Sequence, residues 1–101
     1  MLFRKLFTAA VFLVVSTSPT FAEIPAKEMV CRACHGAGGA APIMDSYPKL
    51  NGQNKAYMVQ VLKAYRAGER KGGMSAVMVA QASGLSDAEI EALSAYYAAQ
   101  P

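Results

Sequence analysis

Cys31-Arg32-Ala33-Cys34-His35 contains both cysteines and the only histidine of this 101-residue chain. Two thiols at positions i and i+3 of a helical turn lie on one face of the helix, so both can reach the same planar group. A histidine directly after the second thiol is then placed to bind a metal held by that group. The spacing predicts covalent attachment of haem, with Cys31 and Cys34 forming thioethers and His35 binding the iron from the proximal side.

Two other interpretations use the same residues. A Cys31–Cys34 redox pair or disulfide is one, but it leaves the adjacent His35 without a role. A zinc site is the other, and such a site usually has four ligands. Cysteine and histidine together supply only three side chains in this chain. One covalently bound haem accounts for all three residues.

The N-terminus has the layout of a secretory signal peptide. Arg4 and Lys5 precede an apolar run over residues 6–15, and small residues follow up to a cleavage site after Ala22. The alternative, a membrane anchor, needs about 18 or more apolar residues, and serine and proline break this run well before that. We expect residues 1–22 to be removed on export to the periplasm.

The remaining residues, 23–101, form one small domain with a correspondingly small core. A covalently held porphyrin would enlarge that core. Without Arg4 and Lys5, the chain has eight basic and seven acidic residues, and this balance argues against a nucleic-acid partner. A basic middle helix and an acidic start to the last helix would make the surface dipolar, although an ordinary solvated surface is the simpler interpretation.

The mature chain is expected to be all-α, because alternating strand patterns are absent and glycine and proline separate helical segments. A short first helix should start near Pro25 and carry Met29, Val30 and Ala33 inward. A loop over residues 36–52 should follow it.

Two further helices carry clear boundary signals. The middle helix is expected over about residues 54–67, and Gly68 is placed to end it. Ser86 and Glu89 form a capping box that starts the last helix. The middle helix should present Lys55, Lys63 and Arg66 outward. The residues expected to face inward are Tyr57, Val61, Leu62 and Tyr65 in the middle helix and Ile90, Leu93 and Tyr97 in the last one.

The second axial position of the iron has no histidine left, so methionines are the candidates. Met29 is two residues from Cys31 and cannot reach the opposite face of the haem. Met58 falls within the middle helix and is more simply a packing residue. Met44, in the loop, is a weaker candidate.

Met74 and Met78 remain, in the segment between the last two helices. Either could bring a thioether to the distal face. Met78 is preferred because Gly72 and Gly73 give the chain freedom before it, and because it lies eight residues before the Ser86 cap.

Four stretches in this order resemble a small class I c-type cytochrome, of the cytochrome c4, c553 and sulfide-dehydrogenase cytochrome-subunit type. They are Cys31-Arg32-Ala33-Cys34-His35-Gly36, Tyr47-Pro48-Lys49-Leu50-Asn51-Gly52-Gln53, Tyr65-Arg66-Ala67-Gly68-Glu69-Arg70, and Ala76-Val77-Met78 followed by Gly84-Leu85-Ser86-Asp87-Ala88-Glu89-Ile90 and Ala95-Tyr96-Tyr97. The resemblance implies three to four helices wrapped around one covalently bound haem c. It also implies that Met78, rather than Met74, is the axial methionine.

In that family a proline carbonyl accepts the proximal imidazole N–H, and Pro42 is the matching position, a role that would fix the ring. One departure is the first helix, which has only eight residues between the expected cleavage site and Cys31. Family members usually have a longer one.

The resemblance implies a periplasmic electron carrier, not an enzyme, that passes single electrons between redox protein partners. A second possibility is the haem subunit of a dehydrogenase complex, such as a sulfide-oxidising flavocytochrome, which the short first helix favours slightly. A peroxidase or gas sensor with an open sixth position is disfavoured, because the chain has no second histidine and no spare constellation of acid–base residues.

Overall fold

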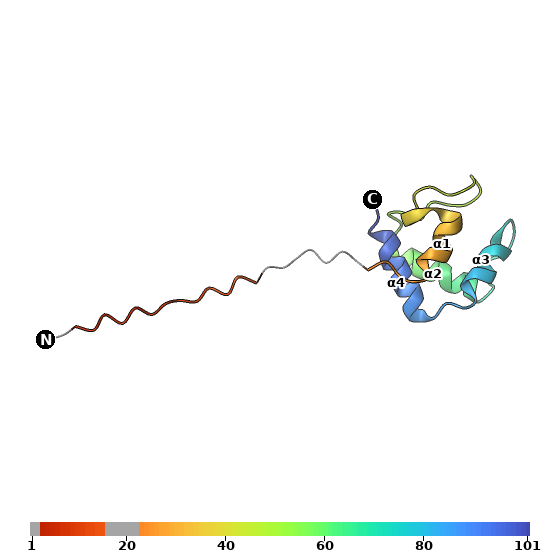
Figure 1. Ribbon diagram of the computed structural model, residues 1–101. Coiled ribbons are helices and arrows are strands. Elements are labelled where there is room, and N and C mark those ends of the chain that lie inside the picture. Colours follow the sequence, from red (N-terminus) through yellow and green to blue (C-terminus); the bar gives the residue numbers. More distant parts are fainter. Residues whose placement is uncertain (1–2, 16–22) are drawn as a thin grey trace.

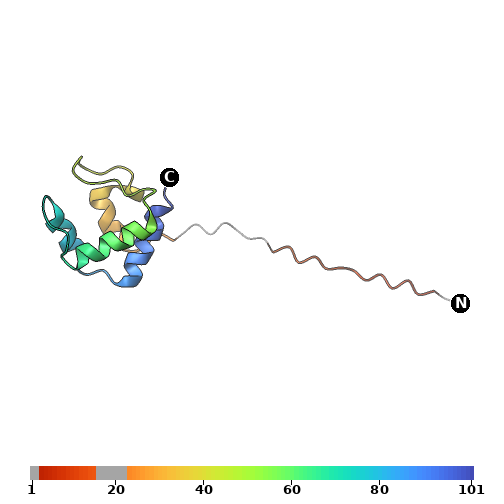
Figure 2. The same ribbon diagram turned by 180° about the vertical axis from the view of Figure 1, so that it is seen from behind.

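The computed structural model describes residues 3–15 and 23–101 (Figure 1). Its helices are α1 (Glu28–His35), the short 3₁₀ helix η1 (Ala37–Gly39), α2 (Lys55–Arg66), α3 (Ser75–Ala82) and α4 (Asp87–Ala98). The described residues contain four α-helices and no strand, which confirms the all-α prediction. Residues 3–15 run away from the helical domain as an extended, exposed segment (Figure 2). The expected cleavage site after Ala22 lies outside the described residues.

Helix α4 supplies most of the core. Ser86 Oγ accepts a hydrogen bond from the Glu89 N–H at 3.1 Å, and Glu89 Oε1 accepts one from the Ser86 N–H at 3.0 Å. The predicted capping box is therefore confirmed. The predicted inward stripe is also confirmed, because Ile90, Leu93 and Tyr97 are all buried.

Helix α2 packs against both α4 and α3. The Asn54 side chain caps its first turn, and Gly68 ends it with a positive φ of 70°. The Gly68 N–H bonds to the Tyr65 carbonyl and the Glu69 N–H to the Ala64 carbonyl, a Schellman ending that satisfies carbonyls of the last turn.

One expected core position of α2 is wrong. Tyr57 is 50% exposed, whereas Met58 is buried in the cluster with Leu93 and Tyr97. Met58 precedes the half-buried Val61 by three residues and the half-buried Leu62 by four. Met58 therefore lies at the middle of the inner face of α2, and Tyr57 lies at the edge of that face. The packing role predicted for Met58 is confirmed.

The inward face of α1 differs from the prediction. The helix begins at Glu28, whose N–H donates to the Pro25 carbonyl, rather than near Pro25 itself. Met29 and Val30 are 72% and 54% exposed, and Ala33 is exposed too. The inner face carries the buried Glu28 and His35 and the half-buried Cys31 and Cys34. Glu28, Cys31 and His35 stand at positions i, i+3 and i+7, which share one side of a helix.

Helix α3 contains the segment that carries Met78. Two glycines with positive φ, Gly72 and Gly73, turn the chain before it, and the run from Ser75 to Ala82 forms two helical turns against α2. The sequence pattern placed only a connecting segment here, because this stretch has neither a side-chain cap nor a strong apolar stripe.

The charges of α2 and α4 face each other in ion pairs. Lys55 lies 3.1 Å from Glu91, and Arg66 lies 2.7 Å from Asp87. Arg66 is half-buried and also donates to the Leu85 carbonyl, so the expectation that it faces outward is wrong. Opposite charges thus pair across the two helices, and the dipolar surface stays a prediction.

Within residues 3–15 and 23–101, none of the helices has both the length and the apolar character required to cross a bilayer.

Candidate functional site

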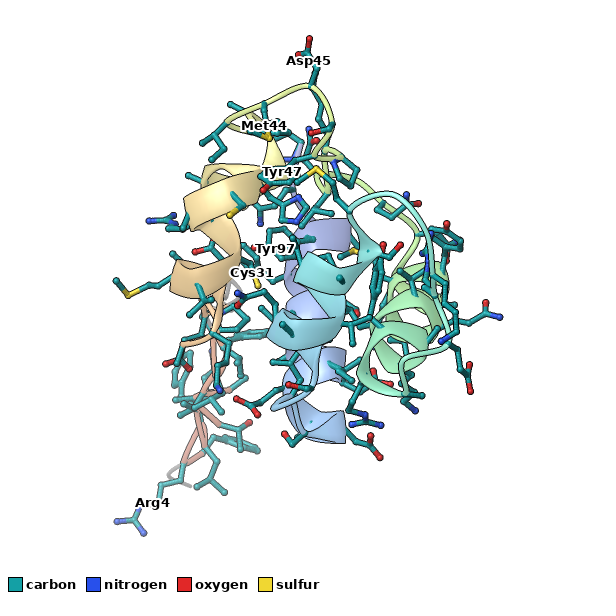
Figure 3. The ribbon with its side chains drawn as sticks, turned by 90° about the vertical axis from the view of Figure 1, so that its right-hand side faces the viewer. Arg4, Cys31, Met44, Asp45, Tyr47 and Tyr97 are labelled. Atoms are coloured by element: carbon teal, nitrogen blue, oxygen red, sulfur yellow. The ribbon has the colours of Figure 1, made fainter. Side chains whose placement is uncertain are left out.

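Helix α1 places both cysteines on one side of a single turn. Cys31 and Cys34 are free thiols, each half-buried. Cys31 packs against the core cluster that contains Tyr97, and Figure 3 shows the two residues side by side, from α1 and α4. The sulfur atoms are the positions at which thioethers to a porphyrin would form.

The surroundings of Cys31 do not suit a redox thiol. Burial raises the pKa of this thiol, and the negative charge of Glu28 adds to the rise. Reactive cysteines of redox pairs have a lowered pKa, because the thiolate is the attacking species. The site therefore favours a structural attachment over the redox-pair interpretation.

His35 is buried at the end of α1, and its ring has a defined orientation. Its Nδ1 lies 2.7 Å from the Pro48 carbonyl oxygen. Because a carbonyl can only accept a hydrogen bond, Nδ1 carries a proton, and in the neutral imidazole this leaves a free lone pair on Nε2. Nε2 is thus available to bind a metal.

The proline at this position differs from the prediction. Pro42 was expected to accept the imidazole N–H, whereas the structure gives that role to Pro48. The Leu50 N–H bonds to the Gly39 carbonyl at 2.9 Å, which returns the chain to the end of α1 and brings the Pro48 carbonyl to the ring. Spacing along the sequence does not reveal this return of the loop.

The turn directly after His35 requires glycine. Gly36 has a φ of 83°, and a Cβ at this position would lie 2.3 Å from the Ala41 carbonyl oxygen. A residue with a side chain would be strained in this conformation and would also collide with the backbone. Gly36 therefore lets the loop fold back over the histidine.

The methionines differ in their surroundings. Met78 is half-buried on α3. Met74 precedes α3, is 44% exposed, and its sulfur accepts a hydrogen bond from Ser46 Oγ at 3.5 Å. Met44 is 46% exposed in the loop near Tyr47 (Figure 3). Met78 is the half-buried one of these three, and it lies on a different helix from His35.

These residues fit haem c. Two thiols lie one turn apart on the same face of α1, an imidazole with a free Nε2 follows them, and a thioether is carried by a separate helix. Residues 22–96 match the protein-family model described as cytochrome C oxidase, cbb3-type, subunit III.

The chain belongs to the c-type cytochrome family.

Individual relatives agree with this assignment. Cytochrome c-554(548) of Halomonas halodenitrificans is 50% identical over 72 residues, which cover 69% of this chain and 83% of that protein. Cytochrome c4 of Stutzerimonas stutzeri is 35% identical over 80 residues, 73% of this chain and 38% of that protein. The thiosulfate dehydrogenase electron acceptor of Thiomonas intermedia is 37% identical over 78 residues, 77% of this chain and 35% of that protein. This cytochrome thus spans over a third of the length of the last two.

The family assignment establishes a class I c-type cytochrome that carries covalently bound haem c. Its role is electron transfer. Sequence reasoning missed Pro48 and Glu28 as members of the site. The 3.6-residue period through Cys31 and His35 was the signal that could have placed Glu28 on the buried face of α1.

Proposed function

We propose that this cytochrome is a periplasmic monohaem carrier whose iron is bound by His35 and Met78, and that it passes single electrons between redox protein partners. The observation that carries the proposal is the hydrogen bond from His35 Nδ1 to the Pro48 carbonyl. His35 lies on α1, the helix that also carries both thiols. This bond presents Nε2 as an axial ligand.

Each residue has a defined part in this proposal. Cys31 and Cys34 hold the porphyrin through two thioethers, and His35 supplies the proximal nitrogen. The Pro48 carbonyl fixes the tautomer and the direction of the ring and makes Nε2 a stronger donor. Haem c supplies an iron that accepts and releases one electron as it changes between the ferric and ferrous states.

Two observations support Met78 over Met74 as the second axial ligand. Met78 is half-buried within α3. The Met74 side chain is more exposed, and its sulfur accepts a hydrogen bond from Ser46. Met78 also lies eight residues before Ser86, which caps α4. A His/Met pair favours the ferrous iron relative to anionic ligands and so raises the potential.

The proposal that the protein is exported depends on residues 1–22 being a signal peptide that is cleaved. The large apolar side chains among residues 6–15 are 72% to 91% exposed, so this run is not part of the core of residues 23–101. N-terminal sequencing of the mature protein should begin at Glu23. A product that retains Met1 and stays in the membrane would contradict both cleavage and the periplasmic location.

A dehydrogenase is the partner class that a specific observation favours. Two relatives, from Thiomonas intermedia and Stutzerimonas stutzeri, are named thiosulfate dehydrogenase electron acceptor. In this second version the cytochrome receives electrons from a catalytic subunit, and its own residues act as described above. Co-purification of the native protein with a dehydrogenase would favour it over a freely diffusing carrier.

The ligand assignment is tested by three methionine substitutions. Met78→Ala should remove the near-infrared charge-transfer band of ferric iron bound to methionine sulfur, lower the potential, and let carbon monoxide bind the ferrous iron. Met74→Ala and Met44→Ala are matched controls, each removing one partly exposed thioether, and should retain the band. Loss of the band in Met74→Ala instead would move the ligand by one helical turn. Retention of the band in all three variants would refute the assignment to Met78.

A further inference from the structure

Glu28 is a fully buried carboxylate next to the attachment site. Its exposed fraction is 0%, and it begins α1 three residues before Cys31. Positions i and i+3 are neighbours on one helix face. Carboxylates are almost never fully buried unless a partner compensates the charge, so the contacts of this one decide what it does.

The negative charge of Glu28 is only partly balanced by its contacts. Oε1 accepts a hydrogen bond from the Gly38 N–H at 3.3 Å. Oε2 lies 2.8 Å from Arg32 Nε, but the guanidinium is not aligned for a hydrogen bond, so Oε2 is buried without a hydrogen-bond partner. The Arg32 side chain is itself 40% exposed, and water screens its charge. A negative charge therefore lies inside the domain while its counter-charge lies partly in solvent.

The field of this carboxylate reaches Cys31, an expected attachment residue, and Tyr97, which packs against it. Its charge contributes to the raised pKa of both the Cys31 thiol and the Tyr97 hydroxyl. These two groups lie together between α1 and α4. Charges in a protein interior interact over longer distances than charges in water, because the effective dielectric constant is lower.

Reduction of the iron removes one positive charge from the site. A fixed negative charge nearby is more favourable beside the ferric state than beside the ferrous state, so it opposes reduction. We propose that the buried Glu28 carboxylate, one helical turn from Cys31, sets the haem potential below the value that the axial ligands alone would give. Glu28 is a positioning and tuning residue rather than a ligand, and its assignment rests on the proposed electron-carrier function.

The test is the midpoint potential of Glu28→Gln, a substitution that keeps the shape and removes the charge. The equilibrium constant for reduction by a reference mediator should rise about tenfold, which is 59 mV for one electron. Glu91→Gln is the matched control, because Glu91 is an exposed carboxylate on a helix, paired with Lys55. It should change the same constant less than about twofold, since water screens it.

Arg32→Gln should shift the haem potential in the opposite direction. It removes the half-exposed cation and leaves Glu28 in place, so it should lower the equilibrium constant, and by less than Glu28→Gln raises it. A lost packing contact would not produce shifts of opposite sign in the two variants. If Glu28→Gln fails to mature, the direction of the Arg32→Gln shift still tests the proposal.

Failure of this inference is distinguishable from failure of the axial assignment. Loss of methionine ligation lowers the potential, so a rise in Glu28→Gln cannot come from a displaced Met78, and the iron–sulfur band reports Met78 separately. A Glu28→Gln potential that equals that of Glu91→Gln, or falls below that of the wild type, would overturn the proposal. An Arg32→Gln shift to higher potential would also overturn it.

Discussion

Tyr97 lies in the core against Cys31, with 1% of its surface exposed. Its hydroxyl is buried near the Cys31 sulfur but outside hydrogen-bonding geometry with any partner. Burial raises the pKa of this phenol far above its ordinary value, with further contributions from Cys31 and Glu28. The neutral form of the phenol is therefore favoured. Its contribution comes from the ring, which meets Tyr96 edge to face at 5.3 Å.

Tyr97→Phe should change the free energy of unfolding by less than about 1 kcal/mol, because a hydroxyl without a partner adds little. Tyr97→Ala should lower the same quantity by about 3–5 kcal/mol, because it leaves a cavity between α1 and α4. Denaturant unfolding of the holoprotein measures both. If the two variants lost equal stability, the hydroxyl would carry an interaction that the structure does not show.

At the scale of a single element, the start of α4 depends on ionised carboxylates. The backbone N–H of Ser86 lowers the pKa of Glu89 below its ordinary 4.5, and the Arg66 hydrogen bond lowers that of Asp87 below 3.8. A group with a lowered pKa in the folded state stabilises the fold above its ordinary pKa. That contribution is lost as the pH falls through the lowered value. The start of α4 should therefore weaken in acid below about pH 4.

Two substitutions test this cap. Ser86→Ala should lower the free energy of unfolding at neutral pH by about 0.5–2 kcal/mol, because the Glu89 N–H loses its acceptor. Glu89→Gln should flatten the dependence of stability on pH in the acid range. Glu91→Gln is the control, because Glu91 is also an exposed carboxylate of α4 but takes no part in the capping box. This variant should keep the acid dependence of the wild type. Equal acid dependence in Glu89→Gln and the wild type would contradict the role of Glu89.

At the scale of the whole molecule, the apolar core is small. The buried hydrophobic residues of the described chain are Met58, Ala82, Ile90, Leu93, Tyr96 and Tyr97, and all belong to α2, α3 and α4. A domain of this size with so few buried side chains is marginally stable without further support. We expect the haem to provide that support, since both of its attachment points lie on α1, which contributes no hydrophobic residue to this set.

A double variant, Cys31→Ala with Cys34→Ala, should lose covalent haem and unfold at a much lower denaturant concentration than the holoprotein. Far-ultraviolet circular dichroism against denaturant measures the midpoint and the slope. The single variants should show a reduced or abolished yield of haem-loaded protein. A haem-free double variant that unfolded at the same midpoint and with the same slope would show that the four helices are stable by themselves.

Local chemistry allowed much of the fold and site to be predicted from the sequence. The Cys31–His35 spacing, the Ser86–Glu89 capping box and the Gly68 ending each depend on residues within about one turn of each other. The buried stripe of α4 was predictable as well, because Ile90, Leu93 and Tyr97 follow the helical period without ambiguity. Such short-range patterns are readable because the helix itself sets the distances between the groups.

The tertiary structure alone decided which residues surround the histidine and the thiols. Pro48, not Pro42, bonds to His35 because the loop returns at Leu50 and Gly39. Glu28 is buried, while Met29 and Val30 are exposed, because α4 covers one side of α1 rather than the more apolar side. These contacts join segments that are distant in the sequence or depend on which helix packs on which. Local helix propensity does not determine such packing, because it depends on how the whole chain folds.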